Sequence, residues 1–257
     1  MKNNMKKKVL SEIRKNNCTL VFFLFVCSML FSINSNETLH FTIDYLGLTV
    51  ANVSFIKTDS LLSVKAKSTA LTNFFTGYFD NTYKTTIDSF FLPTIYQKSI
   101  EQRKYTERSI TIYDFYQNIA FFVDTHNDIL QQYSIQDETR DFFSALFFCR
   151  TLDLEQEYTL KVDAAGKIWL VNITYLKVEN LKTSIGEFHT KKIQVTFSPF
   201  DETLKMRSDI FTNNFVNSEN TLYIWFTDDL NQIPVKTQYS MKRFNVFWNI
   251  KEYKVYE

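Results

Sequence analysis

The chain of 257 residues is poor in the residue types that break, bend or crosslink a polypeptide. It contains four glycines, three prolines and three cysteines. Cys18 and Cys27 lie in the N-terminal segment, so Cys149 is the one cysteine of the remainder, and an internal disulfide is excluded there. Cys149 lies in an apolar run, which favours a buried and unreactive thiol. The few glycines and prolines form no linker, so we expect a single domain after the N-terminal segment.

Glycine scarcity also restricts the chemistry. No nucleophile-elbow, Walker-type or dinucleotide-binding motif occurs in the sequence, and each of these motifs needs closely spaced glycines. The three histidines, His40, His126 and His189, are far apart, and none has a second ligand at metal-binding spacing. We therefore assign no catalytic residue, no cofactor and no metal site from the sequence.

The first 35 residues have the order of a secretory signal peptide. Six basic residues and one acid occur before residue 18, an uncharged apolar run covers residues 20–31, and residues 32–36 are small and polar. The apolar run has about twelve residues, whereas a membrane-spanning helix needs about twenty. We predict cleavage near Ser35 and export to the periplasm or cell envelope. An uncleaved N-terminal anchor in the inner membrane is the alternative.

Removal of this segment changes the sign of the net charge. The whole chain carries 29 basic and 28 acidic residues, but the domain at 36–257 carries 23 basic and 27 acidic residues, a net charge of −4. Mild acidity spread along a chain argues against nucleic acid as a partner. It also argues against strong attraction to anionic membrane surfaces.

The domain has the composition and patterning of antiparallel β-sheet. The chain holds 26 Phe, 14 Tyr and 3 Trp among many Thr, Val and Ile residues, which favours strands. Short runs alternate between apolar and polar residues with a period of two. The clearest of these runs lie at residues 39–45, 62–67, 109–112, 119–123, 129–135, 168–175, 192–197, 222–226, 235–239 and 246–250. Three loops with turn chemistry, at residues 124–128, 163–167 and 228–232, are predicted to connect hairpins.

One segment has the spacing of a helix. Residues 142, 145, 146, 149 and 152 are apolar, and Thr139 or Asp141 can cap the start of this segment. The segment is apolar on nearly all sides, so it should be buried against the concave face of a sheet. A shorter helix is expected near residues 71–75.

These elements predict a mainly β fold, with a strongly curved antiparallel sheet (a half-barrel or barrel) and one buried helix at about residues 139–152. A membrane-spanning barrel also alternates, but charges such as Lys65 and Lys67 interrupt the apolar faces here. The strand at residues 168–175 is apolar on both faces and needs cover on both sides, from the helix or from a ligand cavity.

Three motifs resemble the DUF3108 family of exported bacterial proteins. Residues 39–53, which include Gly47, resemble its opening strand and turn. Residues 141–150 resemble its central helix, with an Asp-Ser-Arg pattern formed by Asp141, Ser144 and Arg150. Residues 222–235 resemble its C-terminal hairpin. The order of the motifs agrees over nearly the whole domain, although the glycine that often follows the first motif is replaced near Ala51.

The resemblance implies a periplasmic and mostly antiparallel β protein, but it implies no activity, because the function of that family is uncharacterised. The seven residues that carry the pattern are expected to have structural roles: Gly47, Asp141, Ser144, Arg150, Trp225, Asp228 and Pro234. Trp225 is expected to anchor the sheet, and Pro234 to start an edge strand. Arg150 is expected to pair with Asp228 or Asp141.

Three functions fit these observations. The first is a non-enzymatic exported protein that holds an apolar small molecule or lipid in the curved sheet. The second is an envelope assembly factor that uses an exposed edge or aromatic patch to bind a protein partner. The third is an enzyme on envelope glycans, which would need two carboxylates across one cleft. Its candidates would come from the acidic pairs at residues 137–138, 201–202 and 228–229.

Overall fold

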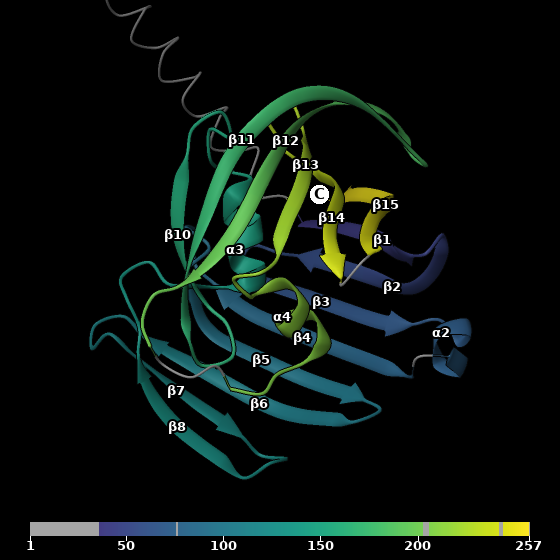
Figure 1. Ribbon diagram of the computed structural model, residues 1–257. Helices are drawn as coiled ribbons and strands as arrows, with labels where there is room; N and C mark the ends of the chain where they lie inside the picture. Colours follow the sequence, from purple (N-terminus) through teal and green to yellow (C-terminus); the bar gives the residue numbers. More distant parts are fainter. Residues whose placement is uncertain (1–35, 76, 203–205, 242–243, 257) are drawn as a thin grey trace, which may run out of the picture. The chain divides into compact units, whose positions relative to one another are not determined.

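The structure is a computed structural model of the chain, and it describes residues 36–75, 77–202, 206–241 and 244–256 (Figure 1). The predicted signal peptide at residues 1–35, and its alternative as an anchor, lie outside the described residues. Among the residues that are described, none of the helices has the length and apolarity needed to cross a bilayer.

Fifteen strands of the described residues form one sheet, and three helices accompany them. The strands are β1 (Asn36–Tyr45), β2 (Leu48–Lys57), β3 (Leu61–Ser68), β4 (Phe79–Ile87), β5 (Pro93–Gln102), β6 (Tyr105–Asp114), β7 (Ile119–Asp124), β8 (Ile129–Ser134), β9 (Arg140–Asp141), β10 (Tyr158–Asp163), β11 (Ile168–Thr183), β12 (Gly186–Pro199), β13 (Thr221–Thr227), β14 (Pro234–Met241) and β15 (Phe244–Tyr256). The helices are α2 (Ala70–Phe75), α3 (Phe142–Cys149) and α4 (Ile210–Phe215).

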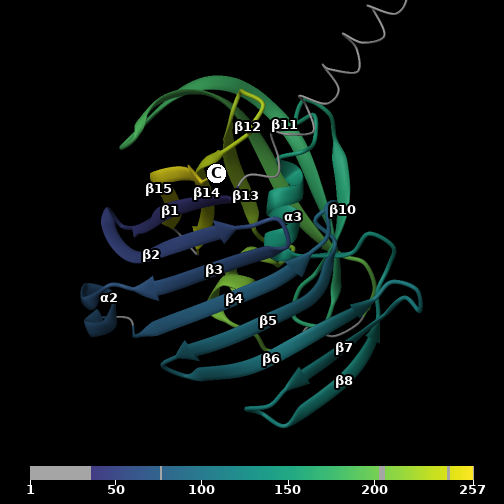
Figure 2. The ribbon, with the colours of Figure 1, turned by 180° about the vertical axis from the view of Figure 1, so that it is seen from behind.

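Most strands pair with the strands next to them in the sequence, as in a meander. In addition, the first strand, β1, pairs with the last strand, β15. The order in the sheet is β8-β7-β6-β5-β4-β3-β2-β1-β15-β14-β13-β12-β11-β10-β9. All neighbours pair antiparallel except β9 and β10, which pair parallel. The sheet curves strongly, and α3 and α4 lie on its inner side (Figures 1 and 2). The predicted fold class, a mainly β protein with a strongly curved antiparallel sheet and a buried helix, is therefore confirmed.

The predicted helix is present but shorter than the apolar spacing suggested. Its predicted range of about 139–152 contracts to 142–149 because Arg140 and Asp141 pair with β10 as the short strand β9. Asp141 is the N-cap, and its side chain accepts hydrogen bonds from the backbone N–H groups of Phe143 and Ser144. The backbone turns away after Arg150, which is the C-cap.

Helix α3 fills part of the inner face of the sheet with aromatic contacts. The ring of Phe143 lies 5.9 Å from that of Phe55 and 4.9 Å from that of Tyr83, and the ring of Phe147 lies 6.4 Å from that of Phe91. Each phenylalanine buried in this way contributes about 1.5–3 kcal/mol. Strands far apart in the sheet are thus held around one helix.

The three predicted hairpin loops are present, between β7 and β8, β10 and β11, and β13 and β14. In the second of them Gly166 has a φ of +66°, and a Cβ at this position would lie 2.3 Å from Cε of Met206. The positive φ favours glycine at this position, whereas the close approach involves only the end of the flexible Met206 side chain. The hairpin of β11 and β12 is long and arched, and Oγ of Ser184 at its tip donates a hydrogen bond to the carbonyl oxygen of Ile250 (2.9 Å).

Candidate functional site

The inner face of the sheet is not filled throughout, because a cavity of about 450 Å³ opens beside α4. Side chains from both ends of the chain line it, and most of its lining surface is apolar. The lining residues are Ile43, Tyr45, Val50, Ala51, Thr72, Gly77, Tyr78, Phe79, Gln102, Arg103, Lys104, Ile210, Phe211, Asn214, Tyr239 and Val246. Pockets of about 300–1,000 Å³ with few polar groups are typical of small-molecule sites.

A β-bulge shapes one wall of this cavity. Ile43 of β1 pairs with Ala51 of β2, but Asp44 pairs with Thr49, so Val50 is an extra residue on β2. An extra residue bends its strand and turns its neighbours. The bulge lies beside Ala51, and Val50 and Ala51 both line the cavity.

The hairpin between β5 and β6 forms the polar rim of the cavity. Arg103 and Lys104 are its two turn residues, and both are exposed. The backbone N–H of Arg103 donates to the carbonyl oxygen of Tyr78 (3.1 Å). Gly77 has a φ of +108°, and a Cβ there would lie 3.0 Å from Cδ of Arg103, so a glycine lets the arginine stem pack against this segment.

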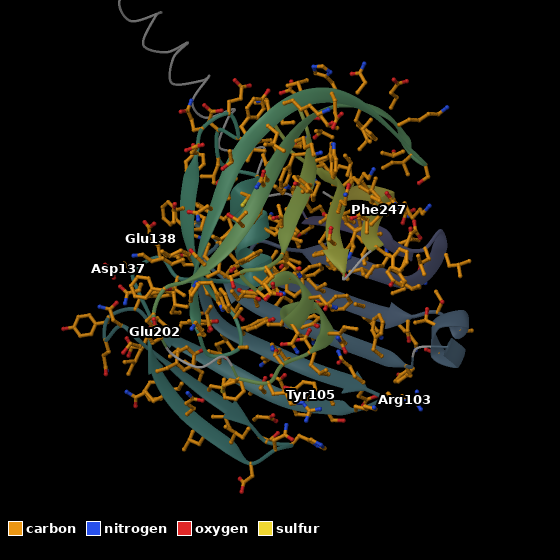
Figure 3. The ribbon with its side chains drawn as sticks, viewed as in Figure 1. Arg103, Tyr105, Asp137, Glu138, Glu202 and Phe247 are labelled. Atoms are coloured by element: carbon orange, nitrogen blue, oxygen red, sulfur yellow. The ribbon has the colours of Figure 1, made fainter. Side chains whose placement is uncertain are left out.

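A second, more polar groove of about 550 Å³ lies on the other side of the same hairpin. The two hollows share Gln102, Arg103 and Lys104 as a common wall. The remaining residues of the groove are Tyr105, Thr106, Phe122, Asp124, His126, Asn127, Ile129, Met206 and Arg207. Figure 3 shows Arg103 and Tyr105 on this hairpin.

The groove carries an excess of positive charge. Its cations are Arg103, Lys104 and Arg207, and within the described residues none of the three is in an ion pair with a carboxylate. The acid of the groove is Asp124, whose carboxylate already accepts hydrogen bonds from the backbone of Arg108 (3.1 Å) and His126 (3.0 Å). Burial opposes its ionisation, but these and further hydrogen bonds outweigh burial and hold the pKa of Asp124 below its usual range.

A buried ionic cluster behind the groove holds α4 in place. Nζ of Lys98 on β5 lies 3.3 Å from Oδ2 of Asp209 and 3.5 Å from Oε2 of Glu107, and it donates to Oγ of Ser208 (2.8 Å). Asp209 is the N-cap of α4, and it also accepts a hydrogen bond from the hydroxyl of Tyr83 (2.7 Å). The cluster therefore ties the residues before α4 to β4, β5 and β6.

The charges within this cluster stabilise one another. Burial disfavours the charge on Lys98, yet the carboxylates of Glu107 and Asp209 outweigh it and raise the pKa of the lysine. Burial likewise disfavours ionisation of Asp209, but Lys98 and the hydroxyl of Tyr83 outweigh it and lower the pKa of Asp209. Because all three charged groups are shielded from solvent, they position the site rather than contact a ligand.

The buried carboxylate of Asp163, unlike those of Glu107 and Asp209, has no cation at contact distance among the described residues. Asp163 at the end of β10 accepts hydrogen bonds at Oδ2 from the hydroxyls of Tyr113 (2.9 Å) and Tyr133 (2.5 Å). Its Oδ1 is buried without a partner among the described residues. Burial raises the pKa of Asp163 to about 6, although both tyrosines and the more distant Lys98 oppose this shift.

The helix residues of the family pattern make hydrogen bonds and an ion pair within the fold, and one predicted pairing is wrong. Asp141 caps α3, and Oγ of Ser144 donates to the carbonyl oxygen of Asp141 (3.1 Å). Arg150 pairs with Glu37 of β1 and not with Asp228 or Asp141. The N-cap Asp141 lies at the opposite end of α3 from Arg150, and Asp228 lies 3.1 Å from Nζ of Lys191 instead.

The remaining residues of the pattern belong to turns and strands. Gly47 completes the β1–β2 turn with a φ of +78°. Trp225 on β13 lies between the ammonium groups of Lys192 and Lys236, at 4.6 and 5.0 Å from the ring centroid. Pro234 is the first residue of β14, as expected, but β14 lies between β13 and β15, so the predicted edge position is wrong. Proline is tolerated there because the first residue of a strand need not donate to the ladder.

None of the seven pattern residues lines the cavity or the groove. Sequence reasoning missed Arg207 and the rim function of Arg103 and Lys104. A basic pair in a polar turn does not differ in sequence from an ordinary solvated turn. The alternating run at residues 109–112 indicates the strand after this turn, but the strand before it, PTIYQKSIEQ, shows no clear alternation, so the hairpin was not recognised.

The acidic pairs considered for glycan chemistry lie in loops. Residues 137–138 precede β9, residues 201–202 follow β12, and residues 228–229 form the β13–β14 turn. Figure 3 shows Asp137, Glu138 and Glu202 well apart from Arg103 and Tyr105, and none of the six acids lines the cavity or the groove.

Other reactive residues of the described chain are isolated or shielded. No group of three or more His, Cys, Asp and Glu side chains suited to a metal ion occurs in the ranges that the structure describes. Cys149 is buried in α3, as expected, and burial raises the pKa of its thiol to about 12.

Comparisons with known proteins agree with the fold and give no activity. A family model described as "Protein of unknown function (DUF3108)" matches residues 40–243. No curated protein sequence matches the chain. The crystal structure of a β-barrel-like protein of the domain of unknown function DUF1849 from Brucella abortus is similar, with a TM-score of 0.56 and 7% identity over 87% of this chain and 98% of that one.

Two further structures match with lower scores. One is named "putative exported protein with YmcC-like fold" and comes from Bacteroides fragilis, with a TM-score of 0.30 and 11% identity over 85% of this chain and 95% of that one. The other is named "putative lipoprotein" and comes from Parabacteroides distasonis, with a TM-score of 0.32 and 12% identity over 86% and 95%. At such scores neither match bears on the fold or the function of this chain.

Proposed function

This chain belongs to the DUF3108 family of proteins of unknown function, and we propose that it is an exported envelope protein that binds an apolar, lipid-like ligand inside its curved sheet. The observation that carries the proposal is the cavity of about 450 Å³ beside α4, with walls that include Ile43, Ala51, Phe79 and Phe211. The proposed location rests on the N-terminal sequence, in which a basic stretch precedes a short apolar run.

Binding to this cavity would be driven by removal of alkyl groups from water. Each buried methylene contributes about 0.8 kcal/mol, so ten of them contribute about 8 kcal/mol. The cost of association is of similar size, about 4–15 kcal/mol. A single acyl chain of ten or more carbons is therefore the smallest ligand for which useful affinity is expected.

We infer a binding protein and not an enzyme, because the polar groups of the cavity wall are suited to contact rather than chemistry. Of the cavity-lining residues, the ionisable ones are Tyr45, Tyr78, Tyr239, Arg103 and Lys104. A general base or nucleophile of the usual carboxylate, histidine or cysteine type is not among them. The rim cations remain suited to hold a ligand.

The proposal can be tested on protein purified from the cell envelope. Native mass spectrometry should detect a bound molecule, and solvent extraction should release a compound with an acyl chain. The Ile210→Trp variant should lose this molecule, because Ile210 lines the cavity from the first turn of α4. Ile112→Trp is the matched control, since Ile112 is 48% exposed on β6 and does not line the cavity. Ligand-free protein, or equal loading of both variants, would contradict the proposal.

A second candidate, an assembly factor for envelope proteins, is favoured by exposed apolar side chains beside a sheet edge. Strand β8 is the last strand at one end of the described sheet. Leu130 on β8 is 78% exposed, and the paired residues Ile112 and Phe121 on β6 and β7 are also exposed. An unpaired strand with such neighbours can accept an extended segment of another protein. A photo-crosslinker at Leu130 in intact cells should then capture a partner, and recovery of monomer alone would count against this function.

A further inference from the structure

The apolar cavity and the basic groove meet at one hairpin, and their combination indicates the chemistry of the ligand. We propose that the groove binds an anionic head group, a phosphate or a carboxylate, of the same molecule whose acyl chain occupies the cavity. This inference rests on the proposed function and adds the class of head group. Gln102, Arg103 and Lys104 line both hollows, so the cavity and the groove adjoin at this hairpin.

The cations of the groove are available to an anion. Arg103, Lys104 and Arg207 form no ion pair with a carboxylate in the part of the chain that the structure describes. Asp124, the acid of the groove, is occupied by hydrogen bonds from backbone N–H groups and from Asn127. The groove is thus a positive site within a domain whose net charge is −4.

Arg207 is also held in position, unlike an arginine on a free surface. The guanidinium of Arg207 lies 5.1 Å from the ring centroid of Tyr105, and one of its nitrogens donates to the carbonyl oxygen of Lys104 (2.6 Å). The hydroxyl of Tyr105 donates to Oε2 of Glu107 (2.8 Å) and lies 3.1 Å from the carbonyl oxygen of Arg207. Glu107 belongs to the buried cluster with Lys98, so the groove is braced from inside the sheet.

Guanidinium groups suit this function because their planar N–H groups bind carboxylate and phosphate oxygens in pairs. Two arginines and a lysine around one groove can neutralise a singly or doubly charged head group. A neutral glyceride would fill the cavity equally well but would leave these cations uncompensated. The structure therefore favours an anionic amphiphile over a neutral one.

Two probes with the same acyl chain separate the head group from the chain. We expect lysophosphatidate to bind at least tenfold more tightly than monoacylglycerol of equal length in isothermal titration calorimetry. The double variant Arg103→Gln/Lys104→Gln, which keeps Arg207, should reduce this preference severalfold by weakening lysophosphatidate binding more than monoacylglycerol binding. The double variant Lys65→Gln/Lys84→Gln removes two exposed lysines outside both hollows and is the matched control.

The outcomes distinguish failure of the head-group proposal from failure of the proposed lipid-binding function. If both probes bind with equal affinity, and Arg103→Gln/Lys104→Gln does not change either affinity, the proposed preference for an anionic head group is overturned. The cavity then remains the binding site. Failure of both probes to bind would overturn the proposed function as well. Inorganic phosphate serves as a third probe. It could bind as tightly as lysophosphatidate, and Ile210→Trp could leave lysophosphatidate binding intact. Those two results together would show that the groove binds a free anion, and they would refute the link between the groove and the cavity. Thermal unfolding of each variant confirms that it is folded.

Discussion

Arg150, the C-cap of α3, forms a two-point ion pair with Glu37 on β1, in which Nη2 lies 3.0 Å from Oε2 and Nη1 contacts Oε1. The side chains are only 11% and 4% exposed. Nε of Arg150 also donates to the carbonyl oxygen of Asn231 in the β13–β14 turn (3.1 Å). One side chain thus joins the buried helix, the first strand and a C-terminal hairpin.

This pair should be far more important for stability than an exposed one. We expect Glu37→Gln to lower the free energy of unfolding by about 3 kcal/mol, because it leaves the buried guanidinium without its counter-charge. Glu101→Gln is the matched control, since Glu101 forms a solvent-exposed pair with Arg108 and should change stability by less than about 1 kcal/mol. Urea denaturation measures both, and equal effects would refute the role assigned to Arg150.

The two buried N-caps provide a second comparison. Asp209 and Asp141 each cap a helix from a fully buried position, but only Asp209 contacts a cation among the described residues. Asparagine caps a helix about as well as aspartate. Asp209→Asn should therefore cost about 3 kcal/mol, because it removes one of the two carboxylates that compensate the buried charge of Lys98.

Asp141→Asn should cost about 1 kcal/mol or less, because burial raises the pKa of Asp141 and so opposes the charge that the variant removes. The free energy of unfolding of each variant is measured at pH 7, and the loss in Asp209→Asn is compared with the loss in Asp141→Asn. Equal losses would show that capping alone accounts for both aspartates.

Stability should depend on pH through Asp163. Below about pH 4 the carboxyl group is protonated in both folded and unfolded chains. Between about pH 4 and its folded pKa of about 6, the unfolded chain ionises while the folded chain keeps the proton, so folding becomes less favourable as the pH rises. The loss is complete above pH 6 and amounts to about 3 kcal/mol.

Asp163→Asn should remove this dependence. The variant should gain stability relative to the natural protein between pH 4 and pH 7, as measured by denaturation at a series of pH values. Tyr133→Phe should shift the transition to higher pH, because the hydroxyl of Tyr133 stabilises the ionised carboxylate. A stability difference that stays constant over this range would contradict the assignment.

Cys149 should resist modification in the folded protein. Its thiol is buried in α3 and its pKa is raised to about 12, so little thiolate forms at pH 8. In protein that begins at residue 36, iodoacetamide should therefore label Cys149 only after guanidinium unfolding, as read by intact mass. Rapid labelling without denaturant would show that α3 leaves the sheet readily.

Local patterning was sufficient to predict most of the strands and the buried helix α3. Alternation with a period of two marks a strand whatever its neighbours are, and the hairpin loops carry their own turn residues. The short helix α4 was missed because its sequence, IFTNNF, has poor helix propensity and spans only six residues. Capping by Asp209, and packing of Phe215 against Trp248 at 5.3 Å, hold it in place instead.

The sequence by itself determined the mainly β class, the buried helix, the hairpin turns and the absence of a disulfide in the domain. Each of these depends on residues that are close together in the chain. Tertiary structure alone decided that Arg150 pairs with Glu37, that Tyr83 reaches Asp209 across 126 residues, and that a cavity and a basic groove share one hairpin. Such contacts depend on how far the sheet curves and which strands it brings together, and no local period in the sequence encodes that curvature.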